Sequence, residues 1–180
     1  MVEIKEHIIY DLLKTKYDRL GIDFVILSID EDYEGLGTHK MAVLTAFNIL
    51  NDRFTEYDFS VDVRPDEMVA RECSMDELLA DPPEYYVTRP EGNRSFNIPE
   101  PTPYWYAFLE PPYGTHYLKS DFEEFNNVLF PDKNDVEVYR WNDDFSDYFD
   151  AGKEWWGTGL WTAFDKSGKT MIVIAASLTD

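Results

Sequence analysis

The chain has 180 residues, of which 44% are hydrophobic, and its aromatic side chains are 12 Phe, 12 Tyr and 5 Trp. This apolar content can build a buried core, so the composition excludes a wholly disordered chain. The 36 Asp and Glu residues outnumber the 16 Lys and Arg residues and give a formal net charge of −20. Such a charge repels phosphate backbones and anionic lipids, which argues against direct binding to nucleic acid or to a membrane surface.

Cys73 is the single cysteine, so the chain forms no intramolecular disulfide and no cysteine-based zinc site. Charged residues interrupt the first 20 positions, which therefore have neither the apolar region of a signal peptide nor a membrane span. We expect a cytoplasmic protein, and no motif in the sequence calls for a cofactor.

The first 81 residues predict mainly helices. Apolar residues at helical spacing favour an amphipathic helix over residues 3–20, ended by Gly21. Residues 22–29 are β-branched and apolar on both faces, which is typical of a short buried strand, with continued helical packing as the alternative. Ser74 and Glu77 have the spacing of a capping box for a short helix ending near Ala80.

A second long helix is predicted after the acidic loop at residues 30–34, with Thr38 as its capping residue. Its apolar residues repeat at helical spacing, and we expect that face to point toward the core. These residues are Met41, Leu44, Phe47 and either Ile49 or Leu50.

Six of the ten prolines lie within residues 82–103, where neither a long helix nor a central strand tolerates the missing amide hydrogens. We interpret residues 82–103 as a connecting strap between a helical region at residues 1–81 and a sheet region at residues 104–180. One continuous domain wrapped by the strap is the alternative. The strap also contains apolar residues that we expect to pack: Tyr85, Tyr86, Val87, Phe96 and Ile98.

The last 77 or so residues predict most of the sheet. Residues 102–110 and 136–141 read as strands, and Ser120 with Glu123 forms a capping box for a helix between them. Its apolar residues Phe122, Phe125 and Leu129 should face inward.

Two final strands, at residues 159–165 and 170–178, should pair as a hairpin whose tight turn uses a positive φ at Gly168. The predicted fold class is α+β, with N-terminal helices followed by a mainly antiparallel sheet and one or two packed helices.

The acidic segment at residues 142–156 is the most informative candidate site. If it forms one helix capped by Asn142, four carboxylates recur on a single face: Asp143, Asp147, Asp150 and Glu154. This stripe would be about 16 Å long and would approach the charge density of a nucleic-acid backbone, so it could bind a basic groove of a partner protein. A solvated helix face is the alternative, and Gly152 weakens the continuation of the helix.

Two catalytic alternatives stay open. Asp143, Asp144 and Asp147 are close enough in sequence to hold Mg²⁺. His116 follows a Gly/Pro-rich turn with Tyr113 and Thr115, where Asp121 or Glu123 could orient it for acid–base chemistry. No nucleophile accompanies it, because Cys73 lies in an acidic stretch that should raise the pKa of its thiol.

Aromatic clusters are the remaining feature, and we expect them to pack in the core, with a partly exposed interface as the alternative. They are Tyr104, Trp105, Tyr106 and Phe108, and Trp155, Trp156 and Trp161.

At PYWYAFLEPPYGTHY (103–117) and EWWGTGLWTAFDKSGKTMIVIAASLTD (154–180) the sequence resembles small acidic proteins carried on mobile elements of Gram-positive bacteria, including type II-A anti-CRISPR proteins. The resemblance covers mainly the C-terminal half and transfers no site residue. It implies inhibition of the guide-RNA-directed effector nuclease, by binding the protein or its guide complex. Some members of that class act catalytically on the guide RNA, which keeps the His116 and Asp143 alternatives open.

We therefore expect an acidic inhibitor that binds a basic, nucleic-acid-handling surface of a partner protein, with the type II CRISPR effector nuclease or its guide-RNA complex as the suspected partner. We expect that the isolated protein binds neither nucleic acid nor a membrane. An immunity protein that neutralises a toxin nuclease and a ribonuclease that acts on guide RNA are the alternatives.

Overall fold

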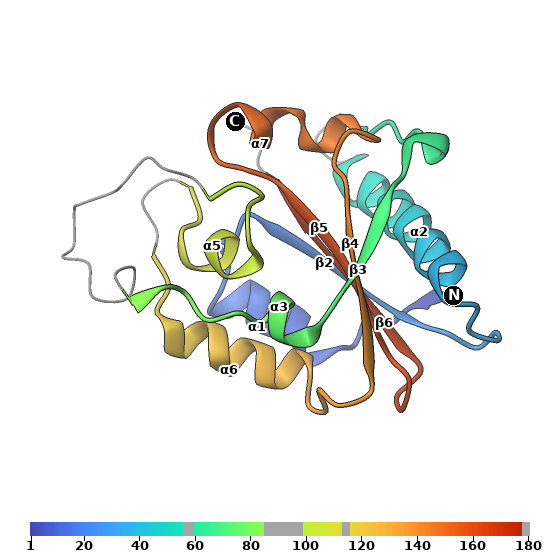
Figure 1. The fold of residues 1–180 in the computed structure, drawn as a ribbon, viewed down its shortest axis with the longest axis horizontal. Coiled ribbons are helices and arrows are strands. Elements are labelled where there is room, and N and C mark those ends of the chain that lie inside the picture. Colours follow the sequence, from blue (N-terminus) through green and yellow to red (C-terminus); the bar gives the residue numbers. More distant parts are fainter. Residues whose placement is uncertain (56–59, 85–98, 113–115, 178–180) are drawn as a thin grey trace.

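A computed structural model describes residues 1–55, 60–84, 99–112 and 116–177. Its centre is a six-stranded antiparallel sheet with the strand order β1-β2-β6-β5-β4-β3 (Figure 1). The strands are β1 (Val2–Glu3), β2 (Ile22–Ser28), β3 (Ala70–Cys73), β4 (Val136–Trp141), β5 (Gly159–Asp165) and β6 (Thr170–Ala176). The predicted α+β class is confirmed.

Helices cover both faces of the sheet (Figure 1). One face packs against α1 (Ile8–Thr15), α3 (Met75–Leu78), α5 (Tyr104–Leu109) and α6 (Lys119–Leu129). The other face packs against α2 (Leu36–Phe54) and the 3-10 helix η3 (Asp147–Phe149), which leads into α7 (Asp150–Trp155). The 3-10 helix η2 (Pro65–Glu67) precedes β3.

The central strands are buried on both sides because their side chains alternate between two separate cores. In β2, Phe24 and Ile26 belong to the first core, whereas Val25 and Leu27 belong to the second. This explains why residues 22–29 are apolar without interruption, and the predicted strand there is confirmed.

Strands from both halves of the chain share this one sheet. β2 pairs along its whole length with β6, and β3 pairs with β4. Between the halves, residues 82–84 and 99–103 of the proline-rich strap are described, while Tyr85, Tyr86, Val87, Phe96 and Ile98 lie outside the described residues. In the part of the chain that the structure describes, no helix is both long and apolar enough to cross a bilayer.

The N-terminal helix is shorter than the predicted range of 3–20. Residues Val2–Glu3 pair with β2 instead, and α1 begins at Ile8 after His7, whose Nδ1 accepts a hydrogen bond from the Ile9 amide at 3.3 Å. Tyr17 lies beyond the end of α1 yet is buried, because its ring packs against Phe108. The helical spacing of apolar residues in the sequence therefore extends beyond the end of α1 at Thr15.

The long helix α2 begins at Leu36, two residues before the predicted cap. Thr38 Oγ1 accepts a hydrogen bond from the Glu34 amide at 2.8 Å and so fixes the preceding loop. Phe47 and Leu50 are buried as predicted, but Met41 is 56% exposed, so its assignment to the core was wrong. The buried face of this helix is shared with small residues such as Ala42 and Ala46.

The predicted strand at residues 102–110 is wrong, because Tyr104–Leu109 form helix α5 after Pro103. All six residues of α5 are buried, so the segment has no polar face from which a helical or strand period could be read. The expectation that this aromatic cluster packs in the core is confirmed, and Trp156 and Trp161 are buried as well. The Trp155 side chain lies outside the description.

The remaining predicted elements are confirmed with small shifts. Ser74 Oγ accepts from the Glu77 amide at 3.0 Å and caps α3, and β4, β5 and β6 lie where expected. The predicted Ser120–Glu123 capping box is wrong, because α6 begins one residue before Ser120 and its capping carboxylate is Asp121, which accepts from the Leu118 amide. In the final hairpin the positive φ of 49° belongs to Lys169, so the prediction for Gly168 was wrong.

Candidate functional site

The predicted carboxylate stripe does not lie on one helix. Ser146 is buried, its hydroxyl donates to the Asp62 carbonyl at 2.8 Å, and it accepts from the Tyr148 amide at 3.2 Å. This side-chain cap starts η3 at Asp147, and the chain continues into the short helix α7 from Asp150. The prediction of an unbroken helix over residues 142–156 is wrong because a capping serine sits inside it.

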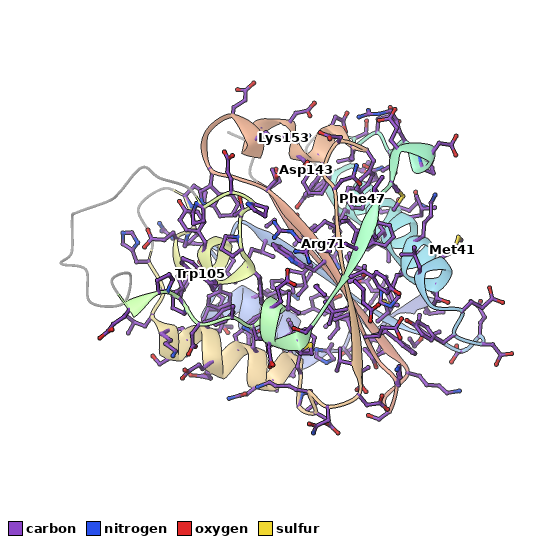
Figure 2. The ribbon with its side chains drawn as sticks, in the orientation of Figure 1. Met41, Phe47, Arg71, Trp105, Asp143 and Lys153 are labelled. Carbon is purple, nitrogen blue, oxygen red and sulfur yellow. The ribbon has the colours of Figure 1, made fainter. Side chains whose placement is uncertain are left out.

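The four predicted carboxylates lie in different environments. Asp143 is half-buried, accepts a hydrogen bond from the Thr158 hydroxyl, and lies 3.6 Å from the Lys153 ammonium (Figure 2). Asp147 accepts from the Asp62 amide at 2.8 Å. Asp150 and Glu154 are exposed.

This end of the sheet, which we call the 143–154 end, carries mixed charge. Lys153 also pairs with Asp144 at 2.9 Å, and the Arg64 guanidinium donates to the Asp144 carbonyl. The binding role of Asp143, Asp147, Asp150 and Glu154 stays a prediction.

A more uniformly acidic cavity lies at the opposite end of the strands, where β2 leads into α2. Its volume is about 670 Å³, and we call it the acidic groove. It is lined by Met1, Glu31, Asp32, Glu34, Gly37, Thr38, Met41 and Thr45. No Lys or Arg side chain is among these lining residues, and the Met1 amino group lies 3.5 Å from the Glu31 carboxylate.

Apolar surface adjoins these carboxylates. The Glu31 side chain is 71% exposed, and Met41 points away from the body of the protein on α2 (Figure 2). Leu36 and Val2, which are the sequence neighbours of the groove residues Gly37 and Met1, are 44% and 63% exposed. The groove therefore combines the exposed Met41 thioether with three carboxylates.

The loop that carries the groove is fixed to the sheet rather than free. The Tyr33 ring stacks on Phe164 of β5 with 4.2 Å between ring centroids. Gly35 has a φ of +62°, a conformation that glycine adopts without strain, and it turns the chain into α2. The backbone that carries the carboxylates on either side of Tyr33 is therefore fixed before any partner arrives.

A network of largely buried hydrogen bonds also connects the Tyr33 loop to the sheet. His39 is fully buried, and its Nδ1 lies 2.7 Å from Thr162 Oγ1 while its Nε2 lies 2.8 Å from the Tyr33 hydroxyl. The Tyr33 hydroxyl donates to Glu137 at 2.5 Å, so it must accept from His39 Nε2–H. His39 Nδ1 then accepts from the Thr162 hydroxyl, which itself accepts from Trp141 Nε1–H at 2.9 Å.

The donor and acceptor roles in this hydrogen-bond network keep His39 neutral, because its Nδ1 acts as an acceptor. Burial lowers the pKa of His39 to about 4, although the nearby Glu137 charge opposes the shift. Burial would raise the pKa of Glu137, but hydrogen bonds from Tyr33 and Tyr139 hold it below its usual value. The network is built to position the loop, because His39 has no exposed surface at which to meet a substrate.

Sequence reasoning did not find this network. His39 was visible only as one of three histidines, and Thr162 and Glu137 lie about a hundred residues away along the chain. No local spacing connects them, and the topology of the sheet alone brings them together.

The catalytic alternatives gain no assembled site. His116 lies on the surface with Nδ1 3.2 Å from the Glu110 carboxylate, so Glu110 rather than Asp121 or Glu123 lies beside it. Tyr113 and Thr115 fall outside the described residues. Across the described ranges, no three His, Cys, Asp or Glu side chains are grouped to hold a metal.

The Cys73 thiol is half-buried. Burial, with a smaller effect from Glu77, raises its pKa to about 11, which confirms the predicted direction.

No known protein family matches the chain, and no curated protein or solved structure is similar to it.

Proposed function

We propose that this protein is an acidic inhibitor that binds a basic, nucleic-acid-handling surface of a partner protein through the acidic groove. The observation that carries the proposal is the groove itself: Glu31, Asp32 and Glu34 line one cavity with the exposed Met41. Among the described residues that line it, the Met1 amino group is a cation and none is a Lys or Arg. A basic protein surface complements both features, because cationic side chains meet the carboxylates and their aliphatic stems meet the methionine.

Electrostatics supports both the approach and the choice of partner. A net charge of −20 steers the protein toward positive surfaces and away from nucleic acid. Enzymes that grip nucleic acid do so in positively charged channels, so their binding surfaces attract an acidic competitor.

The rigidity of the groove favours a blocking role. Tyr33 and His39 fix the loop to the sheet through ring stacking and buried hydrogen bonds. A surface ordered in advance loses little conformational entropy on binding, so more of its interaction energy appears as affinity.

The sequence resemblance supplies the partner to test first, the type II CRISPR effector nuclease or its guide-RNA complex. In this role the protein occupies the effector and leaves the guide RNA intact. We therefore attribute inhibition to binding of the effector rather than to cleavage of its guide RNA.

The experiment incubates the purified protein with the effector loaded with labelled guide RNA, with and without Mg²⁺. We expect target cleavage to stop at about equimolar protein, full-length guide RNA to remain, and affinity to fall as salt rises. Guide RNA that is shortened during incubation would contradict the blocking role. Unimpaired cleavage with no complex formation at low salt would exclude this partner.

A Met41→Glu variant separates the apolar contact from charge, because it adds a carboxylate to a groove that is already acidic. We expect weaker binding from this variant despite its greater negative charge. The control is Asn48→Glu, which adds the same charge at an exposed position of the same helix outside the groove lining.

A further inference from the structure

A second cavity, of about 660 Å³, lies at the 143–154 end of the sheet where β4 ends and β5 begins. Its volume is in the usual range for small-molecule sites. Residues 100–102 form one wall, and the segment from Gly157 to Gly159 lines another part. Asp143 and Lys153, which also line it, lie near one another in Figure 2.

Two glycines, Gly157 and Gly159, line this cavity, and the buried Trp161 ring packs against the second of them. Gly157 has a φ of +113°, and a Cβ atom at Gly159 would lie 2.1 Å from the Trp161 ring. The indole therefore lies directly against the Gly159 backbone. The Arg140 guanidinium is 5.3 Å from the centroid of the same ring, so Trp161 supports Arg140 from one side.

Arg140 is half-buried in an unusual electrostatic position. It lies directly opposite Arg71 on the neighbouring strand β3, and like charges placed so are unfavourable. Arg71 is neutralised by both carboxylate oxygens of Glu77. Arg140 donates to the Thr102 carbonyl at 2.9 Å, and within the described ranges no ion pair with a carboxylate joins it.

This arrangement is notable in a chain with 36 carboxylates. Three other arginines of the structure form ion pairs, Arg53 with Glu3, Arg64 with Glu67 and Arg71 with Glu77, whereas the exposed Arg19 forms none among the described residues. Glu77 and Asp143 act on the Arg140 charge only from beyond ion-pair distance, and a half-buried guanidinium without a direct ion pair costs free energy that pairing would recover. The fold keeps this cation at the edge of a cavity large enough for a ligand.

We propose that the cavity beside Arg140 binds a small monoanionic molecule through its carboxylate or phosphate group. The planar guanidinium has unused N–H donors, and its fork matches two oxygens of such a group. Glu100 and Asp143 also line the cavity, so a polyanion is disfavoured, and the rest of the ligand should offer hydrogen-bond donors to them. This site is independent of the acidic groove and goes beyond the inhibitor role.

The test titrates acetate and, separately, inorganic phosphate into the full chain at constant ionic strength, with chloride as the balancing salt. Binding is followed by NMR through the Arg140 Nε–H and the Trp161 indole N–H. We expect saturable shifts of both signals with a dissociation constant on the order of 1 mM. Comparison of the two titrations tells which oxyanion geometry the site prefers, and pyrophosphate should bind more weakly than either.

Two arginine variants make the test specific. Arg140→Gln should weaken binding at least about tenfold, whereas Arg71→Gln removes the same charge from the opposite strand and should leave binding largely intact. Arg140→Lys retains the charge without the fork, keeps the site testable should Arg140→Gln fold poorly, and should lose part of the affinity. The proposal is overturned by an absence of saturable shifts up to about 20 mM, or by equal weakening in the Arg71 and Arg140 variants.

Discussion

Protonation of His39 should destabilise the protein as the pH falls below neutrality. His39 is fully buried, and burial lowers its pKa in the folded state to about 4 from an ordinary value of 6.5. The unfolded chain therefore binds a proton at a pH where the folded chain does not. The stabilising contribution of neutral His39 is complete above pH 6.5 and is lost as the pH falls toward 4.

The magnitude follows from the size of the shift. Each pKa unit corresponds to about 1.4 kcal/mol, so the difference between 6.5 and about 4 amounts to on the order of 3 kcal/mol. This is a large share of the stability of an ordinary domain. The loss should appear in the free energy of unfolding measured by urea denaturation at pH 7 and at pH 4.

A His39→Gln variant isolates this contribution from the titration of the many carboxylates. Between pH 7 and pH 4, the wild-type protein should lose on the order of 3 kcal/mol more than the variant does. His116→Gln, at an exposed histidine outside the network, is the matched control and should behave as wild type does. The same pH dependence in wild type and His39→Gln would refute the reasoning, as would an NMR titration in which the His39 ring protonates near pH 6.5.

Three further outcomes follow from single contacts. Gly159→Ala places a methyl group against the Trp161 ring and should lower stability by about 1–3 kcal/mol in thermal unfolding; an unchanged melting temperature would show that the ring moves aside freely. Tyr148→Phe removes the hydroxyl that donates to the half-buried Asp23 carboxylate at 2.7 Å. Because burial already raises the pKa of Asp23, the loss of about 1–3 kcal/mol should be larger at pH 7 than at pH 4, and the reverse order in urea denaturation would contradict this. The Cys73 thiol, with a pKa raised to about 11, should react slowly with iodoacetamide at pH 8 and faster as the pH rises, whereas rapid alkylation at pH 8 would be inconsistent with its burial.

The sequence predicted elements well wherever one physical signal dominated. The capping serine of α3, the alternating strand β4 and the apolar strands β5 and β6 all carry local signals that their neighbours do not contradict. Helix α5 was missed because burial on every side removes the polar face that reveals a period.

The site was harder to predict because its parts are joined only by the fold. Spacing alone placed Asp143 and Glu154 on one helix, but the local hydrogen bonds of Ser146 outweigh helical spacing and start a new turn there. The acidic loop at residues 30–34 was visible in the sequence. Its fixed position, however, depends on the contact between His39 and Thr162, which forms only when α2 packs on β5. The spacing of side chains along the sequence cannot reveal contacts between residues that lie so far apart in the chain.

The central claim is that binding occurs at the acidic groove rather than through net charge alone. It is tested most directly by two double charge reversals that change the net charge equally: Glu31→Lys with Asp32→Lys in the groove, and Asp150→Lys with Glu154→Lys at the 143–154 end. The dissociation constant for the loaded effector nuclease is measured for both variants at one ionic strength. We predict at least about a tenfold loss of affinity for the groove variant and a much smaller loss for the other. Equal losses in both variants, or a larger loss at Asp150 and Glu154, would contradict the claim.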